Sequence, residues 1–232
     1  MPTAQEVGRA IARGIAPVAR SVSPAAAGGA LRRVLEVAID GYARVPGART
    51  VAARHLQKHA GSVEDAIDSV VAHHVRLASA QGFVTNIGGV AALPVAIPAN
   101  LAGLAVVQVR MVAALAHLRG YDVGSLQVRT ALVMCLLGDE EVAKRIREGS
   151  LPTSPMAIAT APVFDALLDR RVADAVLADL MNRIGGKNLA LVVTRRVPLL
   201  GGGVGAVVDG LATRQIGLYA KTELLRRRAL AH

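Results

Sequence analysis

Hydrophobic residues recur along most of this chain at the three- and four-residue spacing of α-helices. Between Leu31 and Arg44, for example, one face carries only aliphatic side chains and Tyr42. Glycine and proline residues separate the successive helical segments, with breaks expected at Gly88–Gly89, Pro98, Gly138 and Gly185–Gly186. Ser125 is expected to cap the helix that ends near Gly138. This pattern predicts an all-α fold, in which a single bundle of about eight helices surrounds an apolar centre.

The centre of the predicted bundle is the stretch from Ile87 to Leu118. Its first 23 residues carry no charge, and a helix needs about 20 such residues to span a bilayer. However, Pro94, Pro98, Asn100 and Gln108 interrupt the stretch, and lipid would leave the two amide side chains without hydrogen-bond partners. We therefore expect a glycine- and proline-broken hairpin or helix that is buried within protein.

The chain divides into two parts at about residue 60. Residues 1–60 form a basic, amphipathic helical region that we expect to pack on or beside the core. Residues 61–232 form the helical core domain, whose first helix follows the predicted cap Ser62. The helix predicted over 3–20 has arginines on its polar side, so it suits either packing on the core or a membrane surface.

Composition favours an apolar partner. Hydrophobic residues make up 53% of the chain and aromatic residues only 2%, and the mean hydropathy is +0.42. Aliphatic content this high favours apolar surface reserved for a membrane or a lipid-like ligand. An organic molecule with a long apolar chain is therefore the expected ligand.

Charge gathers at the two ends of the chain. The formal charge is +10, with +6 on residues 1–60 and +6 on residues 186–232. Basic ends suit nucleic-acid phosphates or anionic lipid headgroups. The scarcity of aromatic side chains for base stacking and the absence of a Cys/His finger spacing argue against nucleic acid, so we expect an anionic membrane surface.

The cysteine count and the first residues of the chain indicate the cellular compartment of the protein. Cys135 is the single cysteine, which excludes an internal disulfide. Arg9, Arg13 and Arg20 interrupt the apolar residues near the start, unlike a secretion signal. The sequence predicts a cytoplasmic protein at the inner face of the cell membrane.

Four polar residues are candidate ligand-binding groups. Asn100, Gln108 and Arg110 lie on or beside an otherwise aliphatic helix, and Asp209 lies on a ridge of small residues that repeats every four positions from residue 201 to 217. We expect this ridge to pack against the Ala99/Gly103 side of the central helix. Arg110 then either pairs with Asp209 or extends to water, and if a cavity lies between them the four residues anchor an amphiphile's headgroup.

Two other groups have metal-binding spacing. Asp139 and Glu140 stand at a helix break, where they either hold Mg²⁺ or form an ordinary acidic helix N-terminus. His55 and His59 are spaced to share a metal but lack a recognisable third ligand. The adjacent His73 and His74 must point to different sides of one helix, so we expect one to be buried and the other solvated.

Several motifs together resemble one known family. These segments are GFVTNIGG, LPVAIPANLAG, QVRMVAALAHLRGYD, LLGD and PLLGGGVGAVVDG. As a set they resemble the EcsC family of bacterial proteins over roughly residues 70–228. The resemblance implies an all-helical protein that is linked in some bacteria to an ABC exporter, with no settled biochemical activity.

The leading functional hypothesis is a module that binds a lipid or another long apolar ligand, or that associates with the membrane surface as an accessory to a transporter. It needs no cofactor. The alternative is a Mg²⁺-dependent enzyme acting on an isoprenoid diphosphate or a similar apolar substrate, although DDxxD is absent. A third is a scaffold that docks on a transporter or self-associates through its small-residue ridges. No catalytic triad, Walker motif or dinucleotide fingerprint is present.

Overall fold

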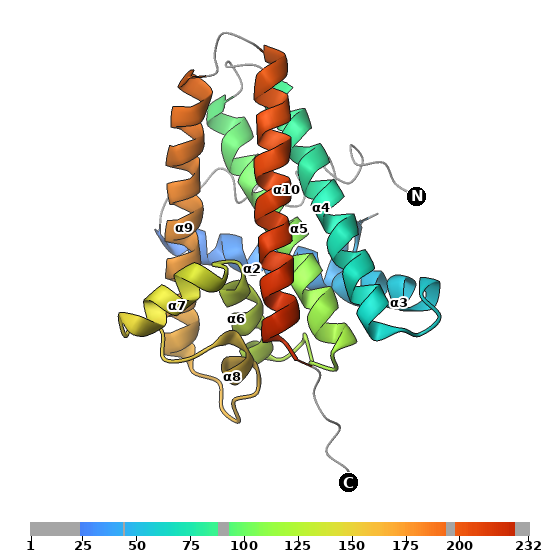
Figure 1. Cartoon of the computed structure of the whole chain (residues 1–232). Coiled ribbons are helices and arrows are strands. Elements are labelled where there is room, and N and C mark those ends of the chain that lie inside the picture. Colours follow the sequence, from blue (N-terminus) through green and yellow to red (C-terminus); the bar gives the residue numbers. More distant parts are fainter. Residues whose placement is uncertain (1–23, 44, 88–92, 194–197, 226–232) are drawn as a thin grey trace.

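The computed structural model describes residues 24–43, 45–87, 93–193 and 198–225, and side chains over 31–43, 45–81, 103–179 and 206–225. Over these residues the chain is all-α, as the sequence predicts, with a bundle of nine helices and one two-stranded ribbon (Figure 1). The helices are α2 (Pro24–Asp40), α3 (Ala48–Lys58), α4 (Val63–Ile87), α5 (Leu93–Leu118), α6 (Leu126–Cys135), α7 (Asp139–Arg147), α8 (Pro155–Ala159), α9 (Ala166–Val193) and α10 (Pro198–Glu223). The ribbon pairs β1 (Gly41–Tyr42) with β2 (Val45–Pro46) in antiparallel register.

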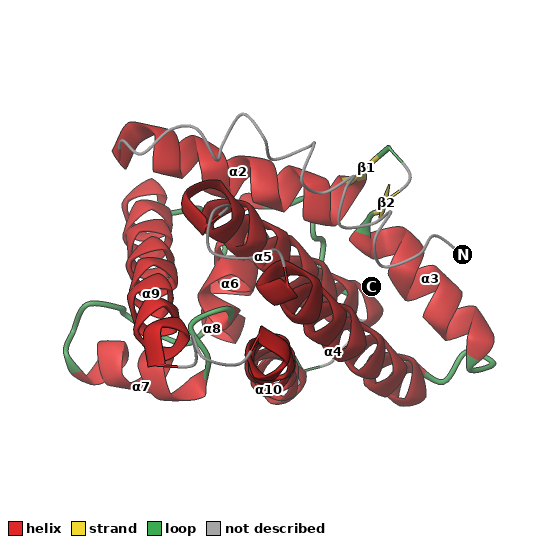
Figure 2. Ribbon diagram, turned by 90° about the horizontal axis from the view of Figure 1, so that it is seen from above, coloured by secondary structure: helices red, strands yellow, loops and turns green. Residues whose placement is uncertain are grey.

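The long helices give the bundle its shape. α4, α5, α9 and α10 run along its length, while α2 and α3 cross them (Figures 1 and 2). The shorter helices α6, α7 and α8 gather at one end, beside α9. This arrangement leaves α10 on the outside of the bundle, packed against α4 and α5.

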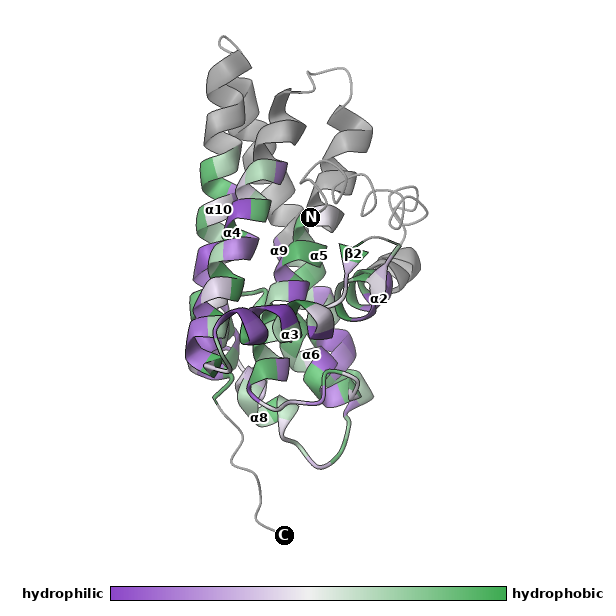
Figure 3. Cartoon of the chain, turned by 90° about the vertical axis from the view of Figure 1, so that its right-hand side faces the viewer, coloured by the Kyte–Doolittle hydropathy of each residue, from purple (hydrophilic) through white to green (hydrophobic). Residues whose placement is uncertain are grey.

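α5 is buried around its whole circumference in the region where its side chains are described. Every residue from Gly103 to Ala116 is buried, because α2, α3, α4, α6 and α10 all contact this helix. In Figure 3 its described part is coloured mainly as hydrophobic, in contrast to α3. From Gly103 onward, the central stretch of the sequence therefore forms the core helix of the bundle.

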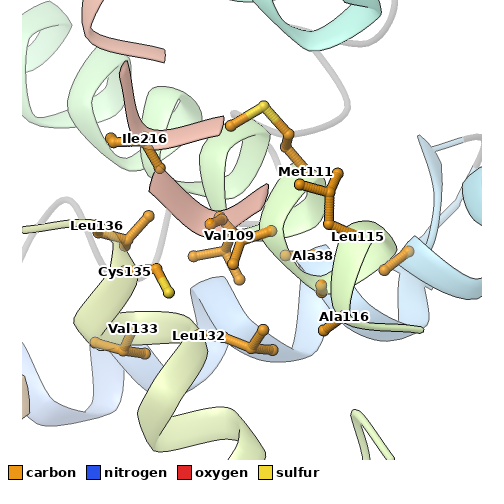
Figure 4. Close-up of a cluster of buried hydrophobic side chains, with 14 of the residues drawn as sticks. Ala38, Val109, Met111, Leu115, Ala116, Leu132, Val133, Cys135, Leu136 and Ile216 are labelled. Atoms are coloured by element: carbon orange, nitrogen blue, oxygen red, sulfur yellow. The ribbon is translucent and has the colours of Figure 1, made fainter. Parts of the chain in front are cut away.

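The side chains that fill the core are small and aliphatic. Figure 4 shows how α2, α5, α6 and α10 contribute to one cluster. Its labelled members are Ala38, Val109, Met111, Leu115, Ala116, Leu132, Val133, Cys135, Leu136 and Ile216. Because valine and alanine are short, the helix backbones can approach closely.

The region before residue 61 contributes to the same core. Leu31, Val37 and Ile39 of α2 and Val51 of α3 are buried in the hydrophobic cluster that includes α5. α2 and α3 thus pack directly on the central helix. The helix predicted over residues 3–20 lies outside the described residues.

Local signals fix several helix boundaries. The Ser125 hydroxyl accepts a hydrogen bond from the Val128 backbone N–H at 3.4 Å and so caps α6. The Asp165 carboxylate accepts from the backbone N–H groups of Leu167 and Leu168 at the start of α9. Gly138 separates α6 from α7 with a φ of 80°, a conformation that favours glycine.

Two expected helix breaks are absent from the helices as the structure assigns them. α5 begins at Leu93 and passes through Pro98. Pro98 removes only one hydrogen bond, to the Pro94 carbonyl, near the helix start, where other N–H groups also lack partners. α9 likewise continues through Gly185 and Gly186 to Val193, since a helical glycine costs about 1 kcal/mol without ending the helix. The expected turn at Gly88 lies outside the described residues.

α10 packs most closely on α4 rather than on the Gly103 side of α5. A methyl group built at Gly217 would lie 2.9 Å from Val71 Cγ1 of α4 and 3.2 Å from Met111 of α5. Gly103 instead faces the Gln81 side chain of α4. At the described positions Gly103 therefore faces α4 and Gly217 faces both α4 and α5, while Ala99, Gly201 and Gly205 lie outside the described side chains.

This contact yields a stability prediction. Gly217→Leu should lower the free energy of unfolding by about 2–3 kcal/mol, because the larger side chain overpacks the junction of α4, α5 and α10. Ala53→Leu adds a leucine at an exposed position of α3 and should change stability by less than about 0.5 kcal/mol. Urea unfolding followed by circular dichroism measures both; equal stabilities would show that the Gly217 contact is not tight.

Candidate functional site

Arg110 is a buried cation on the central helix. Its side chain lies within the bundle and the residue is only 2% exposed. Its Nε donates a hydrogen bond to His74 Nε2 at 3.3 Å, and its Nη1 donates to the Pro46 carbonyl at 3.5 Å. Burial lowers the pKa of the guanidinium to about 10, so it remains charged at neutral pH.

The hydrogen bonds of His74 determine its tautomer. Its Nδ1 lies 2.8 Å from the Val70 carbonyl, which can only accept, so Nδ1 carries the proton. Nε2 is then the lone-pair nitrogen that accepts from Arg110. Desolvation, with the nearby Arg110 charge, holds the pKa of His74 well below its ordinary value, so the imidazole is neutral.

Two more histidines continue from His74 toward the surface. The His73 ring meets the His74 ring edge-on, with 5.3 Å between centroids, and lies 5.6 Å from the ring of His55 on α3. A hydrogen bond of 2.9 Å joins His55 Nδ1 to the Ser69 hydroxyl of α4. We call His55, His73, His74 and Arg110 the histidine–arginine cluster; it joins α3, α4 and α5.

The surroundings of the cluster are basic. Burial first, and then the neighbouring positive groups, lower the pKa of His73 to about 4 and the pKa of His55 below its ordinary value. Those neighbours include Lys58 and Arg76. Among the described residues no carboxylate acts on the pKa of any member of the cluster.

Three of the four predicted ligand-binding residues, Gln108, Arg110 and Asp209, have described side chains. Gln108 is buried and donates to the Thr213 hydroxyl of α10 at 3.2 Å. Asp209 is also buried, but Arg110 pairs with His74 and Pro46 instead, so the expected Arg110–Asp209 ion pair is not formed. The side chain of Asn100 lies outside those described. Arg110 does not reach water beside His117 either.

Asp139 and Glu140 lie in the exposed first turn of α7. The neighbouring Glu141 pairs with Arg145 at 2.8 Å and with Lys144 at 3.8 Å. Within the described part of the chain, no three histidine, cysteine or acidic side chains are placed to hold a metal ion. These contacts are those of an acidic helix N-terminus.

A hollow of about 580 Å³ lies beside α9, lined in part by Arg145, Ser150, Arg171 and Asp174. Its lining includes none of the four predicted ligand-binding residues. The walls carry both signs of charge, and Arg145 already pairs with Glu141. Its lining is about as polar as it is apolar, whereas a lipid chain requires a mainly apolar pocket.

The outward side of α10 is apolar. Val207, Val208, Leu211 and Leu218 are all among the exposed large hydrophobic residues, with exposed fractions from 44% to 59%. At 100° per residue they fall within about a quarter to a third of the helix circumference, together with the exposed Arg214, Gln215 and Thr222. We call this set the α10 apolar face. The side of a surface helix that faces water normally carries polar side chains.

No protein-family model, curated protein or solved structure matches this chain. Among the described residues, no helix combines the length and the apolar character needed to cross a membrane. Function must therefore be inferred from the cluster and from the α10 apolar face.

Sequence reasoning found parts of the cluster without its assembly. The sequence predicted opposite directions for His73 and His74, and the structure places His74 inside and His73 at intermediate exposure. For Arg110 it left open whether the side chain is buried or extends to water, and the structure shows it buried. The contact of His55 with His73 was missed, because no sequence spacing relates α3 to α4. The available sequence signal was that none of the three histidines has an acidic residue three or four positions away.

The Arg110–His74 contact generates an asymmetric mutational prediction. His74→Leu should cost about 3 kcal/mol or more, because it leaves a donor of a buried charge unpaired. Arg110→Met should cost only about 1–2 kcal/mol, since it removes the charge and leaves neutral acceptors unpaired. Chemical unfolding of the two single variants and the double variant measures both costs and their coupling. A larger cost for Arg110→Met would contradict the prediction.

The lowered histidine pKa values predict acid sensitivity. In the unfolded chain these imidazoles titrate near pH 6.5, whereas His73 in the fold titrates at about 4. Between these pH values the unfolded chain binds more protons, so stability falls as the pH falls. Thermal melting from pH 7.5 to 4 should show this loss, and His73→Gln should reduce it. Equal pH profiles for His73→Gln and the parent protein would contradict the prediction.

Proposed function

We propose that this protein is a peripheral membrane-binding module that attaches to an anionic lipid surface through the α10 apolar face. The observation that carries the proposal is the exposure of four aliphatic side chains on one outward helix face. Several exposed apolar side chains on one face are typical of interaction sites. A lipid surface fits the face because a single, nearly straight helix can lie along it.

Charge supports an anionic surface in particular. Residues 186–232, which include α10, carry a formal charge of +6. Arg214 lies exposed among the aliphatic residues of the face, where its long side chain can extend to headgroups while the leucines enter the acyl region. Each basic residue near such a surface contributes about 1 kcal/mol. The proposal places the protein at the inner face of the cell membrane, where anionic lipids are exposed to the cytoplasm.

The magnitudes favour reversible attachment. Full burial of a valine or leucine side chain contributes about 1.5–3 kcal/mol, and the four side chains of the face are only about half exposed beforehand. They therefore supply about 3–6 kcal/mol together, to which the charges add. A membrane transporter, which the EcsC resemblance implies as a partner, would meet the protein on this same surface.

Vesicle sedimentation tests the proposal with lipid alone. The protein should bind vesicles containing about one third phosphatidylglycerol, and binding should weaken as salt rises because salt screens surface charges within about 10 Å at 0.1 M. Leu211→Gln should weaken binding by about fivefold or more, since it removes about 1 kcal/mol or more of apolar transfer.

Leu167→Gln is the matched control. Leu167 is 68% exposed on α9 and Leu211 is 55% exposed on α10, so both substitutions change an exposed helical leucine. Leu167→Gln should leave vesicle binding unchanged, and circular dichroism should show that both variants fold. Equal binding to neutral and anionic vesicles at every salt concentration, or equal losses in the two variants, would refute the proposal.

A further inference from the structure

The histidine–arginine cluster contains a buried positive charge that the described protein does not neutralise. Elsewhere a buried arginine has an acidic partner: Arg119 is 8% exposed and pairs with Glu64 at 3.0 Å. Arg110 is more deeply buried, yet its two hydrogen-bond partners, His74 and Pro46, are uncharged. An uncompensated buried guanidinium is costly, so the site favours an anion from outside the chain.

Hydrogen-bonding capacity in and beside the cluster is also unfilled. A guanidinium has five N–H donors, and Arg110 uses two of them on His74 and Pro46. The remaining three meet no acceptor among the described residues. His59, which is close enough to His55 to act on its pKa, has a buried Nε2 without a hydrogen-bond partner.

The cluster is open at one end. Arg110 and His74 are buried, whereas His55, His59 and His73 are only partly buried. Lys58 and Arg76 are exposed nearby and act electrostatically on both His55 and His73. A ligand arriving between α3 and α4 would therefore meet basic groups first at the surface and then along the imidazoles toward Arg110.

We propose that the histidine–arginine cluster binds a phosphate group. The guanidinium of Arg110 pairs with the phosphate at the inner end of the cluster, and the ring nitrogens of His55 and His73 donate hydrogen bonds to it. A guanidinium presents two parallel N–H groups, which match two oxygens of a phosphate. Imidazoles donate from both nitrogens once protonated. The ligand class is a phosphate monoester or inorganic phosphate, and a lipid headgroup with a terminal phosphate presents the same chemistry.

Binding at this site should take up protons. A bound phosphate supplies the negative charge that the cluster lacks, and it therefore favours the protonated imidazoles. The pKa of His73, about 4 in the free protein because of burial and neighbouring positive groups, should rise when phosphate binds. This change distinguishes occupation of the cluster from general salt effects.

The proposal is independent of the α10 apolar face, because the cluster lies between α3, α4 and α5. Leu211→Gln should weaken vesicle attachment without changing affinity for inorganic phosphate. His73→Gln should weaken phosphate binding without changing attachment to phosphatidylglycerol vesicles, which lack a terminal phosphate. Failure of one proposal is thus visible separately from failure of the other.

The experiment uses the whole chain at pH 7 with sodium phosphate or with sodium chloride of equal ionic strength. The chain has no tryptophan, so thermal unfolding is followed by circular dichroism, and the histidine rings are titrated by NMR. Phosphate should raise the melting temperature above the chloride value and should raise the pKa of His73.

Three variants locate the binding. Arg110→Lys keeps the charge but loses the guanidinium fork and should reduce phosphate affinity by about tenfold or more. His73→Gln should cause a similar loss and serves as the test if Arg110→Lys does not fold. His117→Gln is the control, because His117 lies on α5 beside Arg49 and Asp122, outside the cluster. It should leave phosphate affinity unchanged.

Vesicles of phosphatidylcholine with phosphatidic acid distinguish the two sources of phosphate. A His73-dependent response to inorganic phosphate identifies a soluble phosphate ligand. A His73-dependent response to phosphatidic acid alone identifies a lipid headgroup. The proposal is overturned if phosphate acts no more strongly than chloride and phosphatidic acid vesicles bind His73→Gln as well as the parent protein, or if any phosphate response persists in full in His73→Gln.

Discussion

The burial of α5 around its whole circumference from Gly103 to Ala116 is the constraint on which the rest of this fold depends. A helix with no solvent side must find every polar partner inside the protein. Gln108 meets this requirement through Thr213 of α10, and Arg110 meets part of it through His74 of α4. These two contacts tie α10 and α4 to defined positions along α5, in addition to the aliphatic packing around them.

The sequence was most informative where structure is decided locally. The uncharged centre of the chain predicted the buried helix, and the all-α class followed from spacing along the remaining segments. Ser125 and Gly138 marked helix ends because a cap or a positive φ is a property of a few adjacent residues. Broken helices were predicted at Pro98 and at Gly185–Gly186, where neither residue type alone is enough to end a helix.

The partner of Arg110 was beyond reach from the sequence. Asp209 was the expected partner because it carries the opposite charge on a periodic ridge, and it is indeed buried. Which residue meets Arg110 depends, however, on how far α4 and α10 are rotated about their axes and on where the ribbon places the Pro46 carbonyl. The spacing of residues within one helix determines neither these rotations nor the position of that carbonyl. A neutral imidazole as partner also runs against the usual preference for a carboxylate.

The small side chains of the core have a consequence for its single thiol. Cys135 is fully buried at the end of α6, and burial raises the pKa of its thiol well above the ordinary value. Reagents that modify cysteine attack the thiolate, so they can react only when α6 separates from its neighbours. The rate of alkylation is therefore a direct measure of how often the core opens, in a protein without a tryptophan to report it by fluorescence.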